Sequence, residues 1–161
     1  MSTSTMLILF VIYLAFIIFI VASMWKIFSK AGQPGWACIV PVYNIITLLK
    51  IVGKPWWWLL LMCMPVASLI FLAVNPVVFS IVYFLSFIVT ITYVIWTYNM
   101  LSKSFGKDTG FTAGLVLLGI VFFPILGFGD AKYLGPYGDP AAFAAYGKEN
   151  GFDFERNIMH S

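Results

Sequence analysis

The stretch PVVFSIVYFLSFIVTITYVIWTYNML, residues 76–101, decides the fold class because it contains no charged side chain. A bilayer core of about 30 Å needs about 20 apolar residues in a helix, since unpaired backbone groups are too costly in lipid. The stretch therefore predicts a membrane-spanning helix. Asn75 followed by Pro76 is an uncharged turn signal, which predicts a tight hairpin between this helix and an earlier span.

The overall composition agrees with a membrane location. Hydrophobic residues make up 62% of the 161 residues and charged residues 9%, whereas soluble domains run at about 45–50% and about 25%. The basic residues do not gather into the dense face that a nucleic-acid partner requires, so no nucleic-acid partner is expected. We predict an all-α fold, a polytopic transmembrane helical bundle.

Three further apolar segments are long enough to cross. They are residues 6–24, residues 56–74, kinked by Pro65, and residues 111–128, bent by Pro124. Together with 76–101 they give four predicted spans.

Residues 35–54, GWACIVPVYNIITLLKIVGK, are harder to place. Their uncharged part is too short for a span and is broken by Pro41 and Asn44, so an interfacial or re-entrant segment is favoured. If this segment stays on one side, the lysines between the apolar runs all share one compartment, the cytoplasm by the positive-inside rule. These lysines are Lys26, Lys30, Lys50, Lys54, Lys103 and Lys107.

The predicted organisation is a transmembrane domain at 1–129 and a polar C-terminal tail at 130–161. With four spans, both termini lie outside the cytoplasm, in the periplasm or extracellular space. Acidic residues outnumber basic ones in the tail. Asp139 before Pro140 predicts a short helix that Gly147 ends. The end, FDFERNIMHS at 152–161, is expected to be extended.

Hydroxyl side chains recur every three or four residues along 76–101. This stripe predicts a packing seam with interhelical hydrogen bonds, and the alternative is a hydrated path or a polar ligand site. Gly110 and Gly114 form a G-x-x-x-G pair that predicts close packing on neighbouring helices or on another subunit. The stripe consists of Ser80, Tyr83, Ser86, Thr90, Tyr93 and Thr97.

A second candidate set sits at the expected membrane surface: Lys50, Lys54, Trp56, Trp57 and Trp58. Tryptophan rings favour the headgroup level, and the lysines either bind lipid headgroups or snorkel to water.

Neither a cofactor nor a metal site is predicted. Cys38 and Cys63 lack ligand spacing, and His160 is the sole histidine, so paired-histidine haem ligation within this chain is excluded. No catalytic residue is assigned.

Four pieces in order carry a family resemblance: KAGQPGWACIVPVYN at 30–44, LLKIVGKPWWW at 48–58, LSKSFGKDTGF at 101–111 and FFPILGFGDAKYLGP at 122–136. The chain resembles small bacterial multi-pass membrane proteins of uncharacterised function that are often mislabelled signal peptidase I. The resemblance implies a compact helical membrane domain and brings no activity with it. Ser23 and Met24 match the start of the peptidase motif, but the proline and threonine that follow it are absent.

These features favour a non-enzymatic accessory or scaffolding subunit of a larger inner-membrane complex, with protein export or membrane-protein assembly as one setting. Its expected partners are membrane lipids and other membrane-protein subunits. Two alternatives remain open: a small oligomeric transporter or channel that uses the hydroxyl stripe, and a lipid-binding protein that uses the interfacial segment.

Overall fold

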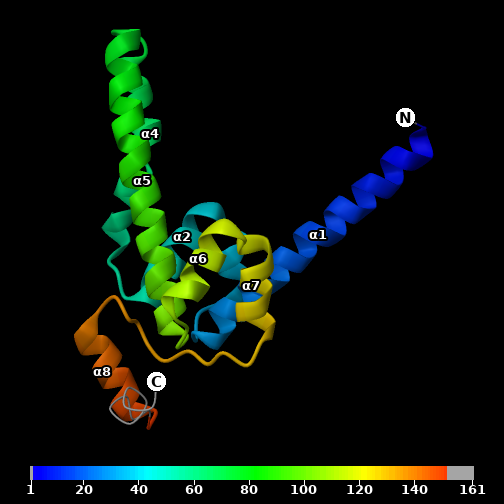
Figure 1. Ribbon diagram of the computed structural model, residues 1–161, viewed down its shortest axis with the longest axis vertical. Coiled ribbons are helices and arrows are strands. Elements are labelled where there is room, and N and C mark those ends of the chain that lie inside the picture. Colours follow the sequence, from blue (N-terminus) through cyan, green and yellow to red (C-terminus); the bar gives the residue numbers. More distant parts are fainter. Residues whose placement is uncertain (1, 152–161) are drawn as a thin grey trace.

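Two long apolar helices dominate the computed structural model, which describes residues 2–151 and has no β-strand among them. These helices, α1 (Thr3–Lys30) and α5 (Pro76–Ser104), are each long and apolar enough to cross a membrane. They leave a common base in different directions (Figure 1). The most apolar window of α1 is 0% buried and that of α5 is 11% buried, so neither helix is the buried core of a water-soluble globule.

The predicted turn before α5 is confirmed. The Asn75 side-chain oxygen accepts hydrogen bonds from the backbone N–H groups of Val77 (2.8 Å) and Val78 (3.3 Å), and Pro76 fills the first helical position. An N-cap followed by proline fixes a helix start because the missing proline N–H would have had no partner there. The helix then continues past the predicted end at Leu101. The helix predicted at 6–24 is likewise longer, since it runs from Thr3 to Lys30.

Residues 56–74 form a broken series instead of one kinked helix. Its pieces are η2 (Trp56–Trp58), α3 (Leu59–Met62), α4 (Met64–Ala67) and η3 (Ser68–Phe71). Pro65 lies in the first turn of α4, where a helix tolerates proline. The series is therefore broken at Cys63, before the proline. The pieces run beside α5 as the other arm of a hairpin (Figure 1).

The single helix predicted over 111–128 is wrong. The segment folds as two short helices, α6 (Thr109–Leu117) and α7 (Gly119–Phe128), because the backbone leaves helical geometry at Leu118 (φ −130°, ψ 44°). The two helices pack on each other, with the rings of Phe111 and Phe122 centred 5.0 Å apart. Pro124, the predicted bend, lies inside α7.

After α1 the chain turns back along it. Residues 35–38 form the short helix η1 (Gly35–Cys38), where the Cys38 thiol donates to the backbone oxygen of Val21 at 3.7 Å. Helix α2 (Pro41–Val52) then returns and ends at Gly53, whose φ of +79° favours glycine at the C-cap.

The buried core lies where the C-terminal ends of α1, α2, α5 and α7 meet, at one end of the molecule. A bundle of four parallel spans would instead spread its core along the helices. The cluster contains Ile27, Phe28, Ala37, Leu48, Ile51, Val52, Met100, Leu101, Phe105, Leu126 and Tyr133.

The described part of the tail crosses this base and continues into α8 (Pro140–Glu149) (Figure 1). Asp139 caps α8 by accepting from the N–H groups of Ala141 and Ala142 at 3.1 Å, as predicted. Gly147 does not end the helix: it is buried within α8, which continues to Glu149. The segment 152–161, predicted to be extended, lies outside the described residues.

Backbone hydrogen bonds attach the tail to the ends of two other helices. The N–H of Leu134 donates to the oxygen of Ser104, and the N–H of Gly138 donates to the oxygen of Val52, both at 2.7 Å. These bonds hold the described part of the tail beside Lys54 and Lys103. Charge composition alone cannot reveal such main-chain pairing.

Candidate functional site

Lys54 joins the predicted interface residues to the tail. Its ammonium donates to the backbone oxygen of Gly138 at 2.7 Å, and it lies 4.9 Å from the ring centre of Trp58 and 5.8 Å from that of Trp96. The Trp58 ring also packs on Tyr93, with centroids 4.7 Å apart. Hydrogen bonding and cation–π attraction together fix the lysine within the fold. Lys54 and Trp58 are therefore structural here.

The other predicted interface residues point outward. Trp56 is 67% exposed and Trp57 is 50% exposed, and Lys50 is exposed on α2. Large aromatic rings held away from the protein near a lysine are typical of the headgroup level of a bilayer. The predicted set thus divides into an inward pair and an outward group.

The N-terminal and C-terminal parts of the predicted hydroxyl stripe differ in burial. Ser80 and Tyr83 are exposed, whereas Ser86, Tyr93 and Thr97 are buried. Of the buried residues, Tyr93 packs on Trp58 of the broken series, whereas Thr97 lines a cavity together with Asn44 and Leu48 of α2.

The hydrogen bonds of the stripe are mostly local. Ser86 donates to the oxygen of Val82 and Thr97 to that of Tyr93, both within α5. Thr90 reaches another element, the backbone oxygen of Leu61, at 3.4 Å. The Tyr93 hydroxyl has no hydrogen-bond partner among residues 2–151. Such back-bonding satisfies hydroxyls in apolar surroundings without requiring water.

The two predicted glycines play unequal roles. A Cβ on Gly114 would collide with the ring of Phe122, so this glycine permits α7 to lie against α6. Gly110 has only the Asp108 side chain nearby, at 3.4 Å. The contact at Gly114 lies within one chain.

A closer backbone contact was missed by sequence reasoning. A Cβ on Gly127 would lie 2.6 Å from the backbone oxygen of Ser23, so α7 approaches α1 through a glycine and a serine. Small residues on both partners are the available sequence signal, but it does not say which pair meets.

Lys30, which the sequence assigned only to membrane topology, makes a second contact between α1 and α7. Its ammonium donates to the backbone oxygens of Leu126 (2.9 Å) and Gly129 (2.6 Å). These carbonyls belong to the C-terminal end of α7, where a positive charge is favoured by the helix dipole. Lys30 therefore ties the end of α7 to the end of α1.

Tyr133 attaches the tail to α2. Its hydroxyl donates to the backbone oxygen of Ile51 at 2.6 Å, and its ring packs on Phe105 and Tyr146. Burial, helped by the neighbouring Tyr146, raises the pKa of Tyr133 well above its usual range. The phenol therefore remains a donor across the physiological pH range.

A partly open cavity of about 180 Å³ lies between α1, α2, α3, α5 and α7. Its walls are mostly apolar, with Asn44 and Thr97 among the polar exceptions. The Asn44 amide donates to the oxygen of Cys38 at 3.1 Å, so part of its polarity is already satisfied.

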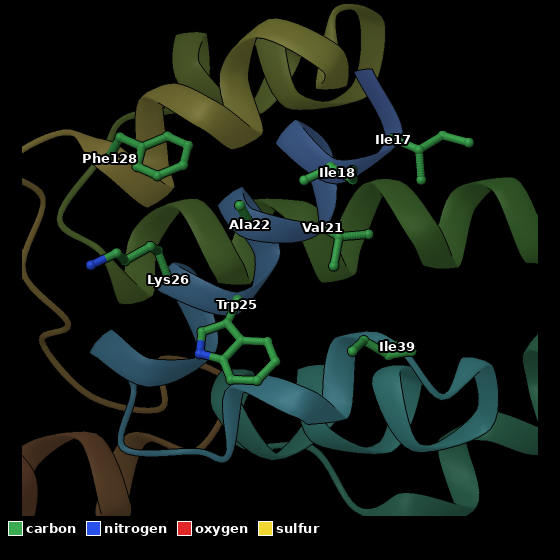
Figure 2. A pocket seen from close by; sticks show the side chains of 8 residues that line it. All are labelled: Ile17, Ile18, Val21, Ala22, Trp25, Lys26, Ile39 and Phe128. Atoms are coloured by element: carbon green, nitrogen blue, oxygen red, sulfur yellow. The ribbon is translucent and has the colours of Figure 1, made fainter. Parts of the chain in front are cut away.

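A larger groove of about 460 Å³ opens at the foot of α1 (Figure 2). Apolar side chains of α1 form one wall, and Ile39 and Phe128 face them from other elements. Trp25 and Lys26 lie toward the end of the groove nearest the base (Figure 2). Residues 2–151 contain no group of three metal-ligating His, Cys, Asp or Glu side chains.

Comparison with known proteins bears on this architecture. The model of a family of unknown function, DUF5684, matches residues 36–87 and 72–136, which together exceed half of the chain. These residues include η1, α2, the hairpin, α6 and α7. No curated protein and no solved structure shows significant similarity to the chain. The chain therefore belongs to DUF5684, a family whose function is unknown.

Proposed function

We propose that this protein is a non-enzymatic accessory or scaffolding subunit of a larger bacterial inner-membrane complex. The observation that carries the proposal is the outer part of α1: every residue from 2 to 19 is exposed. Protein export or membrane-protein assembly is one setting for such a subunit.

The support comes from how α1 is held. Its lower end is fixed by the close Ser23–Gly127 backbone contact and by the two hydrogen bonds of Lys30. Its outer part therefore projects in a set direction away from α5 (Figure 1). Lipid alone can cover such a helix, but a rigid, separately projecting helix also offers a whole surface for packing against partner spans.

The proposed topology has three crossings: α1, the broken series at 56–74, and α5. Helices α6 and α7, of 9 and 10 residues, are each about 15 Å long, half of a bilayer core of about 30 Å. We place 109–128, and also 31–54, as re-entrant hairpins that enter and leave on the lysine side. The four-span arrangement, with 111–128 crossing, is the alternative.

In this topology the lysine turns and the tail are cytoplasmic and the N-terminal end of α1 is periplasmic. Cysteine labelling with a membrane-impermeant maleimide in spheroplasts tests it, after Cys38 and Cys63 are changed to serine. We expect Ser4→Cys to be labelled from outside, and Lys107→Cys and Lys148→Cys only after permeabilisation. Labelling of Lys148→Cys from the side opposite Lys107→Cys would support four spans.

Photocrosslinking tests the scaffolding function. A photoreactive amino acid at Leu9 or Ile12 of α1, at native expression, is expected to give one protein adduct of defined mass. The matched controls are Phe84 and Leu85, which are equally apolar and exposed on α5. Only lipid adducts from α1, or the same adducts from α1 and α5, would contradict the proposed scaffolding role.

A small oligomeric transporter or channel is the second candidate, and the cavity between Asn44 and Thr97 favours it. It predicts that Ser86→Ala and Thr90→Val change the flux of ions or small polar solutes in proteoliposomes. Flux equal to that of empty vesicles would remove this candidate.

A further inference from the structure

We propose that the groove at the foot of α1 binds one anionic phospholipid from the surrounding bilayer, with an acyl chain in the groove and the phosphate at Lys26. This site is separate from the outer part of α1 that the scaffolding function uses. It rests on the proposed topology in that α1 crosses the membrane with Lys26 at its cytoplasmic surface.

The length and chemistry of the groove fit an acyl chain. Ile17 at one end and Lys26 at the other are about 14 Å apart along α1, at about 1.5 Å per residue. One leaflet of the hydrocarbon core is about 15 Å deep. Between these ends the lining is apolar, from Ile18, Val21 and Ile39 among others (Figure 2). At about 460 Å³ the groove is also within the usual size of ligand pockets.

Two hydrogen-bond donors at the base end of the groove remain free. Within residues 2–151, neither the Lys26 ammonium nor the Trp25 indole N–H has a hydrogen-bond or ion-pair partner. The Trp25 ring lies directly on Gly35, where any Cβ would collide with it, so the indole is held in place. By contrast, the ammonium of Lys30, one turn further along α1, donates hydrogen bonds to two backbone oxygens.

The charge around this end favours an anion. Within residues 2–151, the charges that act on Lys30 are Asp130, which has the strongest effect, and the two lysines Lys26 and Lys107. The local excess of ammonium groups suits a phosphate, and lysines on the cytoplasmic side of a span attract anionic lipid. A partner helix seated in the same groove would cover its walls but leave Lys26 without a counter-charge. A phospholipid would cover the apolar walls with its acyl chain and pair its phosphate with Lys26.

Native mass spectrometry of the full chain in mild detergent tests the site. The protein is mixed with phosphatidylglycerol or with phosphatidylcholine of the same chains. We expect one phosphatidylglycerol to be retained in preference to phosphatidylcholine. Lys26→Gln should lower that retention about five-fold, as expected for losing one attraction between an ammonium and anionic lipid near the surface. Lys148→Gln, which removes an exposed lysine on α8 outside the candidate interface residues, is the control and should retain lipid like the unaltered protein.

The variant Ala22→Phe fills the groove and tests the contribution of the acyl chain separately from that of the charge. It should lower retention of both lipids. Because Lys26 is exposed and unpartnered, Lys26→Gln should fold normally, and an unchanged thermal midpoint verifies this. Equal retention by Lys26→Gln and the unaltered protein would overturn the proposal, as would equal losses for Lys26→Gln and Lys148→Gln. A photoreactive group at Ile18 that captured protein instead of lipid in native membranes would also overturn it.

Discussion

The segments 76–104 and 109–128 are both strongly apolar, yet one stays a single helix and the other folds back on itself. After Pro76, α5 contains no glycine or proline. Residues 109–128 contain Gly110, Gly114, Gly119 and Gly127 as well as Pro124. Two of these glycines lie at close contacts, one between α6 and α7 and one between α7 and α1. Hydropathy therefore identifies both segments as apolar, but glycine positions determine which of them packs within the protein.

The largest expected effect is at the contact between α7 and α1. Gly127→Ala places a methyl group 2.6 Å from the Ser23 oxygen and 3.1 Å from its Cα, and backbone atoms cannot rotate away. We expect the free energy of unfolding in detergent to fall by about 2–3 kcal/mol, the upper part of the range for overpacking. Gly119→Ala is the control, because its methyl meets only the Phe123 ring at 3.4 Å. Equal stability of the two variants would mean that α7 does not rest on α1.

The sequence predicted the parts of the fold that follow from local signals. The Asn75–Pro76 start of α5, the Asp139 cap and the helical character of the chain are confirmed. The break at Leu118 was missed because a turn between two apolar helices needs no polar residue when the surroundings are apolar. The position of the tail was missed for another reason: it depends on main-chain bonds to Ser104 and Val52, which composition does not encode.

The same reasoning applies to the candidate site. The stripe and the tryptophans were found because residue type alone suggests packing or an interface. The groove was missed because it forms only when Ile39 and Phe128, far apart in the chain, meet α1. Lys30 was assigned to topology because its hydrogen-bond acceptors, about a hundred residues away, are backbone oxygens of α7.

The second prediction concerns the tie between α1 and the end of α7. Lys30→Met keeps an apolar stem of similar length and removes both hydrogen bonds to α7. Charged hydrogen bonds contribute about 1.5–3 kcal/mol, and partial exposure of Lys30 lowers the expected loss to about 1–2 kcal/mol. Denaturant titration in detergent measures it. Lys50→Met removes an exposed lysine with no partner among residues 2–151 and should change stability little, so a loss matching that of Lys30→Met would point to general charge effects.

The third prediction concerns the fold-back itself. Gly114→Ala pushes against the Phe122 ring, a side chain that can shift, while alanine also favours helix by about 1 kcal/mol. The net loss should be about 1 kcal/mol. Gly110→Ala, on the same helix with more room, should be neutral or slightly stabilising. A gain in stability for both variants would show that α6 and α7 are not closely packed, and a continuous helix over 111–128 would regain support.

The smallest effect on stability is expected in α5, which contacts the broken series at 56–71 through a hydroxyl rather than through glycine. Thr90→Val keeps the shape of the side chain and removes a long 3.4 Å hydrogen bond to Leu61, so the loss should not exceed about 0.6 kcal/mol. Ser86→Ala removes a bond within α5 only and should cost less still. A loss of more than about 2 kcal/mol at either position would contradict this account, because a weak or local hydrogen bond cannot supply it. The buried hydroxyls would then have to belong to a hydrated network, and the hairpin would depend on polar contacts as strongly as α7 depends on glycine.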